Sequence, residues 1–152
     1  TNCTLTDNVA TAGGGITSGG PHGPATLQNT ILALNRGIGP TSSTDDCRGD
    51  VTSLGNNLIG DPTGCTIPLQ PSDLTGDPGL DTFTDNGRPG KGHFPLLPTS
   101  QAIDAGNDAG CLRTDQLGQR RIGPCDIGTI RLLDNTDVLQ EDNPATAAQE
   151  TR

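Results

Sequence analysis

The apolar residues of this chain occur in short runs, separated by Gly, Pro, Asn, Asp and Thr, and the pattern repeats. Residues 2–8, 29–35 and 56–62 each begin with Asn and carry an aliphatic side chain at the fourth position, so that the Asn recurs at a constant interval, at 2, 29 and 56. A short strand and a turn residue at a fixed phase of about 20 to 30 residues are typical of stacked solenoid coils. The pattern therefore predicts an all-β, right-handed parallel β-helix with few coils.

Equivalent positions of such a solenoid stack about 4.8 Å apart, the separation of neighbouring strands. The side-chain amides of Asn2, Asn29 and Asn56 are therefore expected to form a ladder from coil to coil. A shift of one residue exchanges the two faces of a strand, so the pattern leaves two alternatives for the inward side chains. They are the set Leu5, Leu32 and Ile59, or the set Thr4, Ile31 and Leu58.

The repeat divides the chain into three parts. Residues 1–80 are predicted to form the coils, with glycine turns before Ile16 and a second short strand at that residue. Residues 81–131 have lost the period and are rich in Asp-Pro and Asp-Asn-Gly turns, which indicates an irregular C-terminal cap over strands that the last coil leaves unpaired. Residues 132–152 are predicted to be an acidic tail.

Composition and charge exclude several classes of protein. The chain has 22 Gly, 12 Pro, only 30% hydrophobic residues and no Trp, Tyr or Met, so a compact core built on aromatic side chains is not expected. Disorder is the first alternative, but the repeat and the five Cys argue against it. A net charge of −9 argues against nucleic acid and anionic membranes as partners. No apolar stretch approaches the roughly 20 residues of a membrane span.

The cysteines point to an oxidising compartment. Two local disulfides, Cys47–Cys65 and Cys111–Cys125, are the most economical interpretation, because neither spacing is that of a zinc or thioredoxin-like site. Cys3 is left over and is expected to be a small buried apolar side chain, with a disulfide to missing sequence or another chain as the alternative. Asn2-Cys3-Thr4 also matches a glycosylation sequon, which is accidental if Asn2 lies in a stacked turn.

A series of short motifs carries a resemblance to a known family. In chain order they are Asn29–Ala33, Asp46-Cys47, Leu54–Asp61, Gly64-Cys65, Ser72-Asp73-Leu74, Gly76-Asp77-Pro78, Asp85-Asn86-Gly87, His93, Leu96-Leu97-Pro98, Ala102–Gly106, Thr114–Gly118 and Cys125–Gly128. This series resembles the C-terminal region of bacterial right-handed β-helix repeat proteins with a choice-of-anchor Q domain. The resemblance covers residues 1 to about 131.

The resemblance implies an exported protein with the β-helix fold and agrees with the proposed cysteine pairing; it implies no settled activity. Relatives often end in a surface-anchoring segment and continue Asp-Ile-Gly with a small residue, an aromatic and Glu. Here the sequence is Asp126–Arg131 followed by an acidic stretch, which puts that mode of anchoring in doubt.

Three carboxylates are a candidate metal site. Asp104, Asp115 and Asp126 are evenly spaced along the chain and could converge near the Cys111–Cys125 loop to hold a structural Ca²⁺ ion. The alternative is that they cap backbone amides in turns, as Asp does in Asp-Ala-Gly and Asp-Ile-Gly contexts.

Parallel β-helices also host polysaccharide lyases and hydrolases, so a carbohydrate-active fragment with its catalytic coils upstream is the alternative function. Several features weaken it. Two Phe, Phe83 and Phe94, provide little of the aromatic platform that sugar clefts present. His93 has no partner in the sequence for base catalysis and is expected to be a polar loop residue. Arg120-Arg121 is expected to be a solvated pair or to bind a carboxylate.

The sequence thus favours a non-enzymatic scaffold, adhesin or assembly subunit located outside the cell, on its surface or in the periplasm, with no catalytic residues and no cofactor other than calcium. With Thr1 first, the chain is expected to be a processed product or a fragment. The first coil should present residues 2–8 as an unpaired edge, which another protein chain would cover; a second copy stacked head to tail would form a filament. Polysaccharide is a further possible partner.

Overall fold

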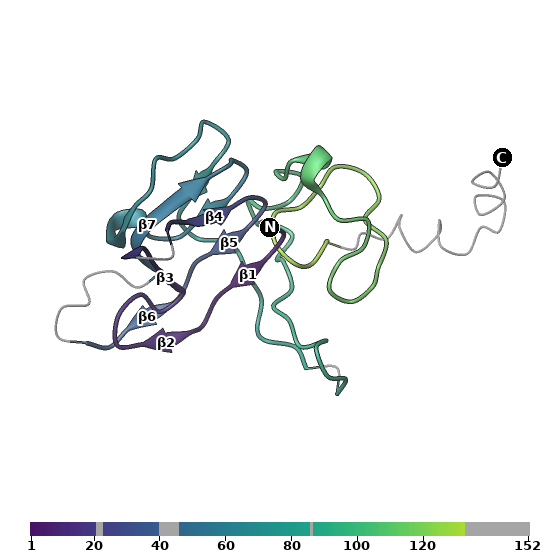
Figure 1. Ribbon diagram of the computed structural model, residues 1–152. Coiled ribbons are helices and arrows are strands. Elements are labelled where there is room, and N and C mark those ends of the chain that lie inside the picture. Colours follow the sequence, from purple (N-terminus) through teal and green to yellow (C-terminus); the bar gives the residue numbers. More distant parts are fainter. Residues whose placement is uncertain (21–22, 40–45, 86, 133–152) are drawn as a thin grey trace, which may run out of the picture.

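The computed structural model describes residues 1–20, 23–39, 46–85 and 87–132 (Figure 1). Among these residues the elements with defined bounds are short strands and 3-10 turns. In chain order these are β1 (Thr4–Leu5), β2 (Val9–Ala10), β3 (Ile16–Ser18), β4 (Ala25–Leu27), β5 (Ile31–Leu32), β6 (Arg36–Gly37), β7 (Cys47–Ser53), β8 (Leu58–Ile59), η2 (Pro62–Gly64), β9 (Cys65–Thr66), β10 (Leu74–Thr75) and η3 (Asp108–Gly110).

The strands form three parallel sheets, which confirms the predicted β-solenoid. The first sheet has the order β1-β5-β8-β10, the second pairs β2 with β6, and in the third β3 and β4 both pair with β7, which also pairs with β9. The register of the first sheet, Thr4 to Ile31 to Leu58, reproduces the interval between the asparagines of the repeat. Ile16 begins the strand expected there, whereas β2 and β4 were not anticipated.

The third coil is shorter than the first two, and this explains why the repeat fades after residue 60. β10 pairs with β8 through Leu74 and Leu58, which are closer together in the chain than the paired residues Leu58 and Ile31. β9 likewise follows closely after its partner β7, with Cys65 beside Gly49. Because the coil has lost its second strand, the phase that linked the first two coils no longer applies to the sequence beyond residue 60.

Each long coil has two non-glycine residues with left-handed backbone, both at corners that flank the first sheet. Asn2, Asn29 and Asn56 have φ of 51°, 49° and 55° immediately before the first sheet. Asp7 and Leu34, with φ of 55° and 62°, turn the chain from the first sheet to the second. Asn and Asp tolerate this region, whereas it costs most other residues about 1–2 kcal/mol. Four of these five corner positions carry Asn or Asp, and Leu34 is the exception.

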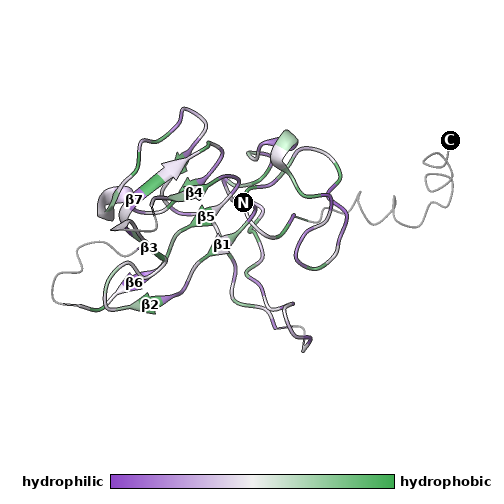
Figure 2. Cartoon of the chain, in the orientation of Figure 1, coloured by the Kyte–Doolittle hydropathy of each residue, from purple (hydrophilic) through white to green (hydrophobic). Residues whose placement is uncertain are grey.

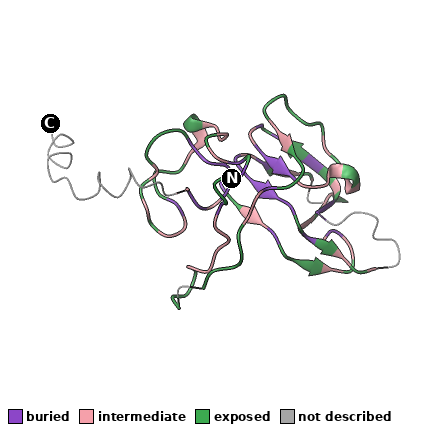
Figure 3. Cartoon of the chain, turned by 180° about the vertical axis from the view of Figure 1, so that it is seen from behind, coloured by how far each residue is buried: buried purple, intermediate pink, exposed green. Residues whose placement is uncertain are grey.

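The two alternatives for the inward face are both realised, because both faces of the first sheet are buried. Leu32 packs inside the coils with Leu27, Cys47 and Val51. On the opposite face Ile31, Ala33 and Leu58 pack against a second cluster that the C-terminal region supplies, namely Leu96, Ala102 and Ile127. Hydropathy changes sign over short distances along the chain (Figure 2), and the buried residues gather where the strands meet the C-terminal loops (Figure 3).

The C-terminal region therefore takes a different place from the expected one over the last coil. It lies along the outer face of the first sheet and reaches back to the first coil, beside β1 and β5 (Figure 1). The backbone N–H of Gly128 donates to Asn29 O at 3.0 Å, and that of Thr129 donates to Thr4 Oγ1 at 3.1 Å. A Cβ at position 128 would lie 2.8 Å from Thr4 Oγ1, so only glycine permits this approach. The expected acidic tail lies outside the described residues.

Truncation of Leu32 tests the inner core. Leu32→Ala removes a fully buried side chain and is expected to lower the free energy of unfolding by about 2–5 kcal/mol. Leu34→Ala is the matched control, since Leu34 is 58% exposed two residues away, and should change stability by less than about 0.5 kcal/mol. With no Trp or Tyr in the chain, unfolding should be followed by circular dichroism or calorimetry. Equal losses for the two variants would contradict the described packing.

Candidate functional site

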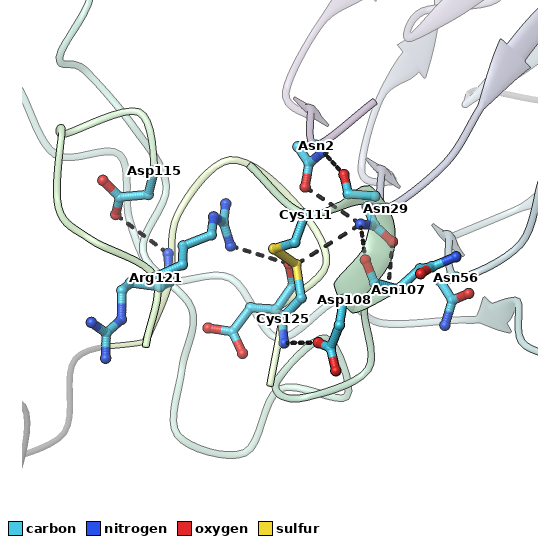
Figure 4. Close-up of a disulfide and its surroundings, with 12 residues drawn as sticks. Asn2, Asn29, Asn56, Asn107, Asp108, Cys111, Asp115, Arg121 and Cys125 are labelled. Carbon is cyan, nitrogen blue, oxygen red and sulfur yellow. Dashed lines mark hydrogen bonds between the residues drawn. A yellow bond between two sulfur atoms is a disulfide. The ribbon is translucent and has the colours of Figure 1, made fainter. Parts of the chain in front are cut away.

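The stacked asparagines lie where the coils meet the C-terminal region. Asn29 is fully buried, and its amide both accepts from the backbone N–H of Asn107 at 2.7 Å and donates to Asn107 O at 3.0 Å. Asn2 donates to Gly110 O and Asn56 donates to Ala105 O, each at 2.9 Å. Figure 4 shows this column beside the Cys111–Cys125 disulfide. The column therefore attaches the C-terminal region to the coils.

Contacts along the column itself are weaker than the expected ladder. Asn29 Nδ2 lies 3.5 Å from Asn2 Oδ1, and the amide of Asn56 binds Ala105 instead. The bond from Asn2 Nδ2 uses the group that glycosylation of the sequon would modify, so Asn2 behaves as the stacked-turn interpretation expects. Because the three asparagines occupy the same position of the repeat, their amides point in the same direction, toward the C-terminal loop that supplies their partners.

A second set of asparagines, which was not singled out from the sequence, links consecutive coils directly. The backbone N–H of Asn8 donates to Asn35 Oδ1 at 3.2 Å, and that of Thr30 donates to Asn57 Oδ1 at 3.1 Å. The next link follows the same rule, because the N–H of Asn57 donates to Asp73 Oδ1 at 2.9 Å. A side-chain oxygen of one coil thus satisfies a backbone amide of the coil before it. The sequence feature that could have predicted these links is the Asn at the last position of the first two repeats, Asn8 and Asn35.

Both predicted disulfides are present. Cys47–Cys65 joins β7 to β9, and therefore the second coil to the third, with 5.5 Å between the Cα atoms. Cys111–Cys125 closes the loop that faces the asparagine column, with a Cα separation of 6.1 Å. Disulfides are a feature of proteins from oxidising compartments. No helix in the described part of the chain is long and apolar enough to cross a membrane.

The prediction that Cys3 is buried is wrong, because this cysteine is free and exposed. The equivalent positions of the next two coils, Thr30 and Asn57, are buried within the stack. Cys3 belongs to the first coil, where β1 is the end strand of its sheet. A position of the repeat that is buried in the following coils is therefore exposed in the coil at the end of the stack.

The structure does not gather the three candidate calcium ligands into one cluster. Among the described residues, no group of three or more His, Cys, Asp or Glu side chains is placed to hold a metal ion. Asp115 Oδ1 accepts the N–H groups of Leu117 and Gln119. Asp126 accepts those of Asp104 and Leu132. The contacts of Asp115 match the turn-capping alternative, whereas Asp126 joins separate segments, because Asp104 lies 22 residues away from it in the chain. The calcium site stays a prediction that a Ca²⁺ titration of thermal unfolding would test.

Arg121, from the basic pair Arg120-Arg121, binds backbone carbonyl groups of the C-terminal region. Arg121 donates from Nη2 to Gly128 O at 2.8 Å and from Nη1 to Asp126 O at 3.3 Å, while its buried Nε has no partner among the described residues. Burial lowers the pKa of the Arg121 guanidinium, and the nearby carboxylates of Asp115 and Asp126 act in the opposite direction. Arg120 O accepts a bond from Arg131 Nη1 at 2.6 Å. Arg121 thus holds residues 126–128 in place.

The remaining sequence candidates lie in the hairpin that precedes the C-terminal loops. His93 Nδ1 is 2.9 Å from Lys91 O, in keeping with a polar loop residue. Phe83 and Phe94 contact each other with ring centroids 5.3 Å apart, so Phe94 does not stand free as a platform. Thr84 and His93 face each other across the hairpin.

Among the described residues, the C-terminal region contains pockets of about 230 Å³ and about 360 Å³. The first lies at the seam with the first coil and contains Asp115 and Arg121; its other lining residues are Asn2, Leu112, Thr114, Gln116 and Thr129. The second is lined by Arg88, Lys91, Leu117 and Gln119. Among the described residues that line these two pockets, Asp115 is the one carboxylate.

Replacement of the column residues by glycine tests their role in attachment, because glycine keeps the left-handed corner and removes only the amide. Asn29→Gly deletes two hydrogen bonds to Asn107 and should lower the free energy of unfolding by about 2–3 kcal/mol. Asn56→Gly deletes one bond to Ala105 and should cost about 1 kcal/mol. Hydrogen exchange at the Asn107 amide should accelerate in the first variant only. Unchanged exchange there would contradict this role.

Comparisons with protein-family models, with curated proteins and with solved structures give no match to this chain.

Proposed function

We propose that the chain is a non-enzymatic extracellular or cell-surface scaffold that assembles by stacking another protein chain on its first coil. β1 ends the order of its sheet, and β5 is the strand that it pairs with in the described part of the chain. An end strand presents unpaired backbone groups, which form a template for a further strand. A strand added there would continue the parallel sheet by β-augmentation.

The observation that carries the proposal is the side-chain oxygen of Asn8. In three successive links a side-chain oxygen accepts the backbone N–H of the preceding coil: Asn35 from Asn8, Asn57 from Thr30, and Asp73 from Asn57. Asn8 occupies the phase of Asn35 one coil earlier, is exposed, and its Oδ1 accepts no bond from another described residue. The first coil therefore offers both an open strand and the acceptor that a stacked coil would use.

The family resemblance supports the same proposal in its finer details. A right-handed coil, membership of the choice-of-anchor Q group and location outside the cell or in the periplasm are consistent with the parallel sheets and the two disulfides. A carbohydrate-active fragment is the second candidate. It has the weaker support, since in the pocket of about 230 Å³ Asp115 is already bound by backbone amides and no second carboxylate of the described residues lines the walls.

Native mass and negative-stain imaging of the material from its natural source test the proposal. Particles or fibres that contain the chain at fixed stoichiometry are expected. A folded monomer that lowers the viscosity of an acidic polysaccharide would overturn the scaffold role and support the enzyme.

A charge on the first coil tests which surface is used. Val9→Lys places an ammonium group on β2, where Val9 is 52% exposed, and should weaken the assembly about tenfold because stacking would desolvate the charge. Leu54→Lys is the matched control: Leu54 is 55% exposed but belongs to the second coil, so the assembly should be unchanged. Assembly and its concentration dependence should be measured by light scattering. Equal behaviour of the two variants would contradict stacking on the first coil.

A further inference from the structure

The pocket between residues 88–91 and 117–119 differs in charge from the rest of the molecule. The chain carries a net charge of −9, yet this pocket is lined by two cations, Arg88 and Lys91, together with Leu117 and Gln119, and no carboxylate of the described residues lines it. Its volume of about 360 Å³ falls within the range of small-molecule sites. A pocket lined by charges of one sign focuses the electric field and raises the local concentration of ions of the opposite charge.

Hydrogen bonds hold the two walls of the pocket together. Gln116 Nε2 donates to Gly90 O at 3.1 Å and to Gly92 O at 2.7 Å. Lys91 Nζ returns a bond to Gln116 O at 2.7 Å. Three side-chain bonds thus bridge loops that are well separated in the chain. A ligand would meet a site whose walls are already positioned, which reduces the entropy lost on binding.

Hydrogen bonds within each wall of the pocket also fix its conformation. The N–H of Lys91 donates to Arg88 O at 3.0 Å, which closes a turn that puts both cations on one wall. On the other wall Asp115 Oδ1 accepts the N–H groups of Leu117 and Gln119, each at 2.9 Å. Asp115 also interacts electrostatically with the Arg121 guanidinium, which offsets part of its negative charge.

The side chains that line the pocket retain free donors. Neither the Arg88 guanidinium nor the Gln119 amide makes a hydrogen bond or ion pair with another described residue, and Lys91 uses one of its three protons on Gln116. In the pocket of about 230 Å³ the side chains of Asn2 and Asp115 and the Nη atoms of Arg121 are bound to backbone groups, and the buried Nε of Arg121 is left without a described partner. Several free donors therefore converge in the basic pocket, on Arg88, Lys91 and Gln119.

We infer that this pocket binds a sugar-sized organic anion through its carboxylate. The planar Arg88 guanidinium can hold a carboxylate by two parallel bonds, and Lys91 adds a second charge. Gln119 can bind a hydroxyl group, and Leu117 offers an apolar contact for the C–H face of a ring. A uronic acid combines these features, whether free or as a residue of an acidic polysaccharide. The inference is independent of stacking on the first coil.

Titration of the whole chain with four probes tests the inference: sodium glucuronate, glucose, inorganic sulfate and a galacturonate trimer. Amide resonances of Lys91, Leu117 and Gln119 are expected to shift saturably with glucuronate, with a Kd of about 1 mM or lower, and to remain in place with glucose. Tighter binding of the trimer would identify a polysaccharide as the source, and equal binding would identify the free acid. Absence of saturation with both uronates, or equal shifts with sulfate and glucuronate, would overturn the inference.

Two arginine variants complete the test. Arg88→Gln removes an exposed guanidinium without a described side-chain partner and should weaken glucuronate binding at least tenfold, with an unchanged circular dichroism spectrum. Arg113→Gln is the matched control, because it removes the same charge from an exposed residue that does not line the pocket, and its affinity should stay within twofold. Raising the ionic strength should weaken binding to the unmodified chain. Equal loss in both variants would show nonspecific attraction and contradict the site.

Discussion

Burial of both faces of the β1-β5-β8-β10 sheet is the constraint on which the rest of the structure depends. The paired segments are only two residues long, so their backbone hydrogen bonds alone cannot offset the entropy of ordering the chain. Stability must come from apolar side chains on both sides. Leu32 contributes to the core inside the coils, and Ile31 and Leu58 contribute to the core beneath the C-terminal loops. A chain with 30% hydrophobic residues can form two cores only because one sheet serves both.

Because both faces of this sheet are buried, particular polar residues are required at particular positions of the coils. Each coil brings backbone groups and corner residues close to buried space, where an unpaired N–H or C=O is costly. Asn29 satisfies both polar groups of Asn107, and Asn57 and Asp73 satisfy amides of the preceding coil. Asn29 also sets a left-handed corner, as Asn2 and Asn56 do. Asparagine thus performs two tasks at one position, which accounts for its recurrence at a fixed phase.

The two proposed interaction sites follow from the same architecture. The first coil ends the stack, so it exposes the same kind of surface that packs against a neighbouring coil elsewhere in the solenoid. The exposed Asn8 and Cys3 lie on this coil. The C-terminal loops have no repeat to obey and are free to form a local site. Arg88 and Lys91 share a wall there because a turn and the bonds of Gln116 position them. Assembly and ligand binding would therefore occupy different parts of the molecule.

The sequence by itself determined the parallel coils and the first corner of each repeat, because these depend on local phase: an Asn at 2, 29 and 56 imposes the same turn each time. It also indicated both disulfides, through the short spacing within each cysteine pair. Only the tertiary structure decided which faces are buried. Ile31 and Leu32 are both apolar, and nothing within the repeat shows that Ala102 and Ile127 return to cover the first of them. The same long-range packing gave the asparagine amides their partners at 105–110, and it left Asp115 and Asp126 bound to different backbone amides. Contacts between segments so far apart in the chain leave no periodic trace in the sequence, since they join a repeating element to an irregular one.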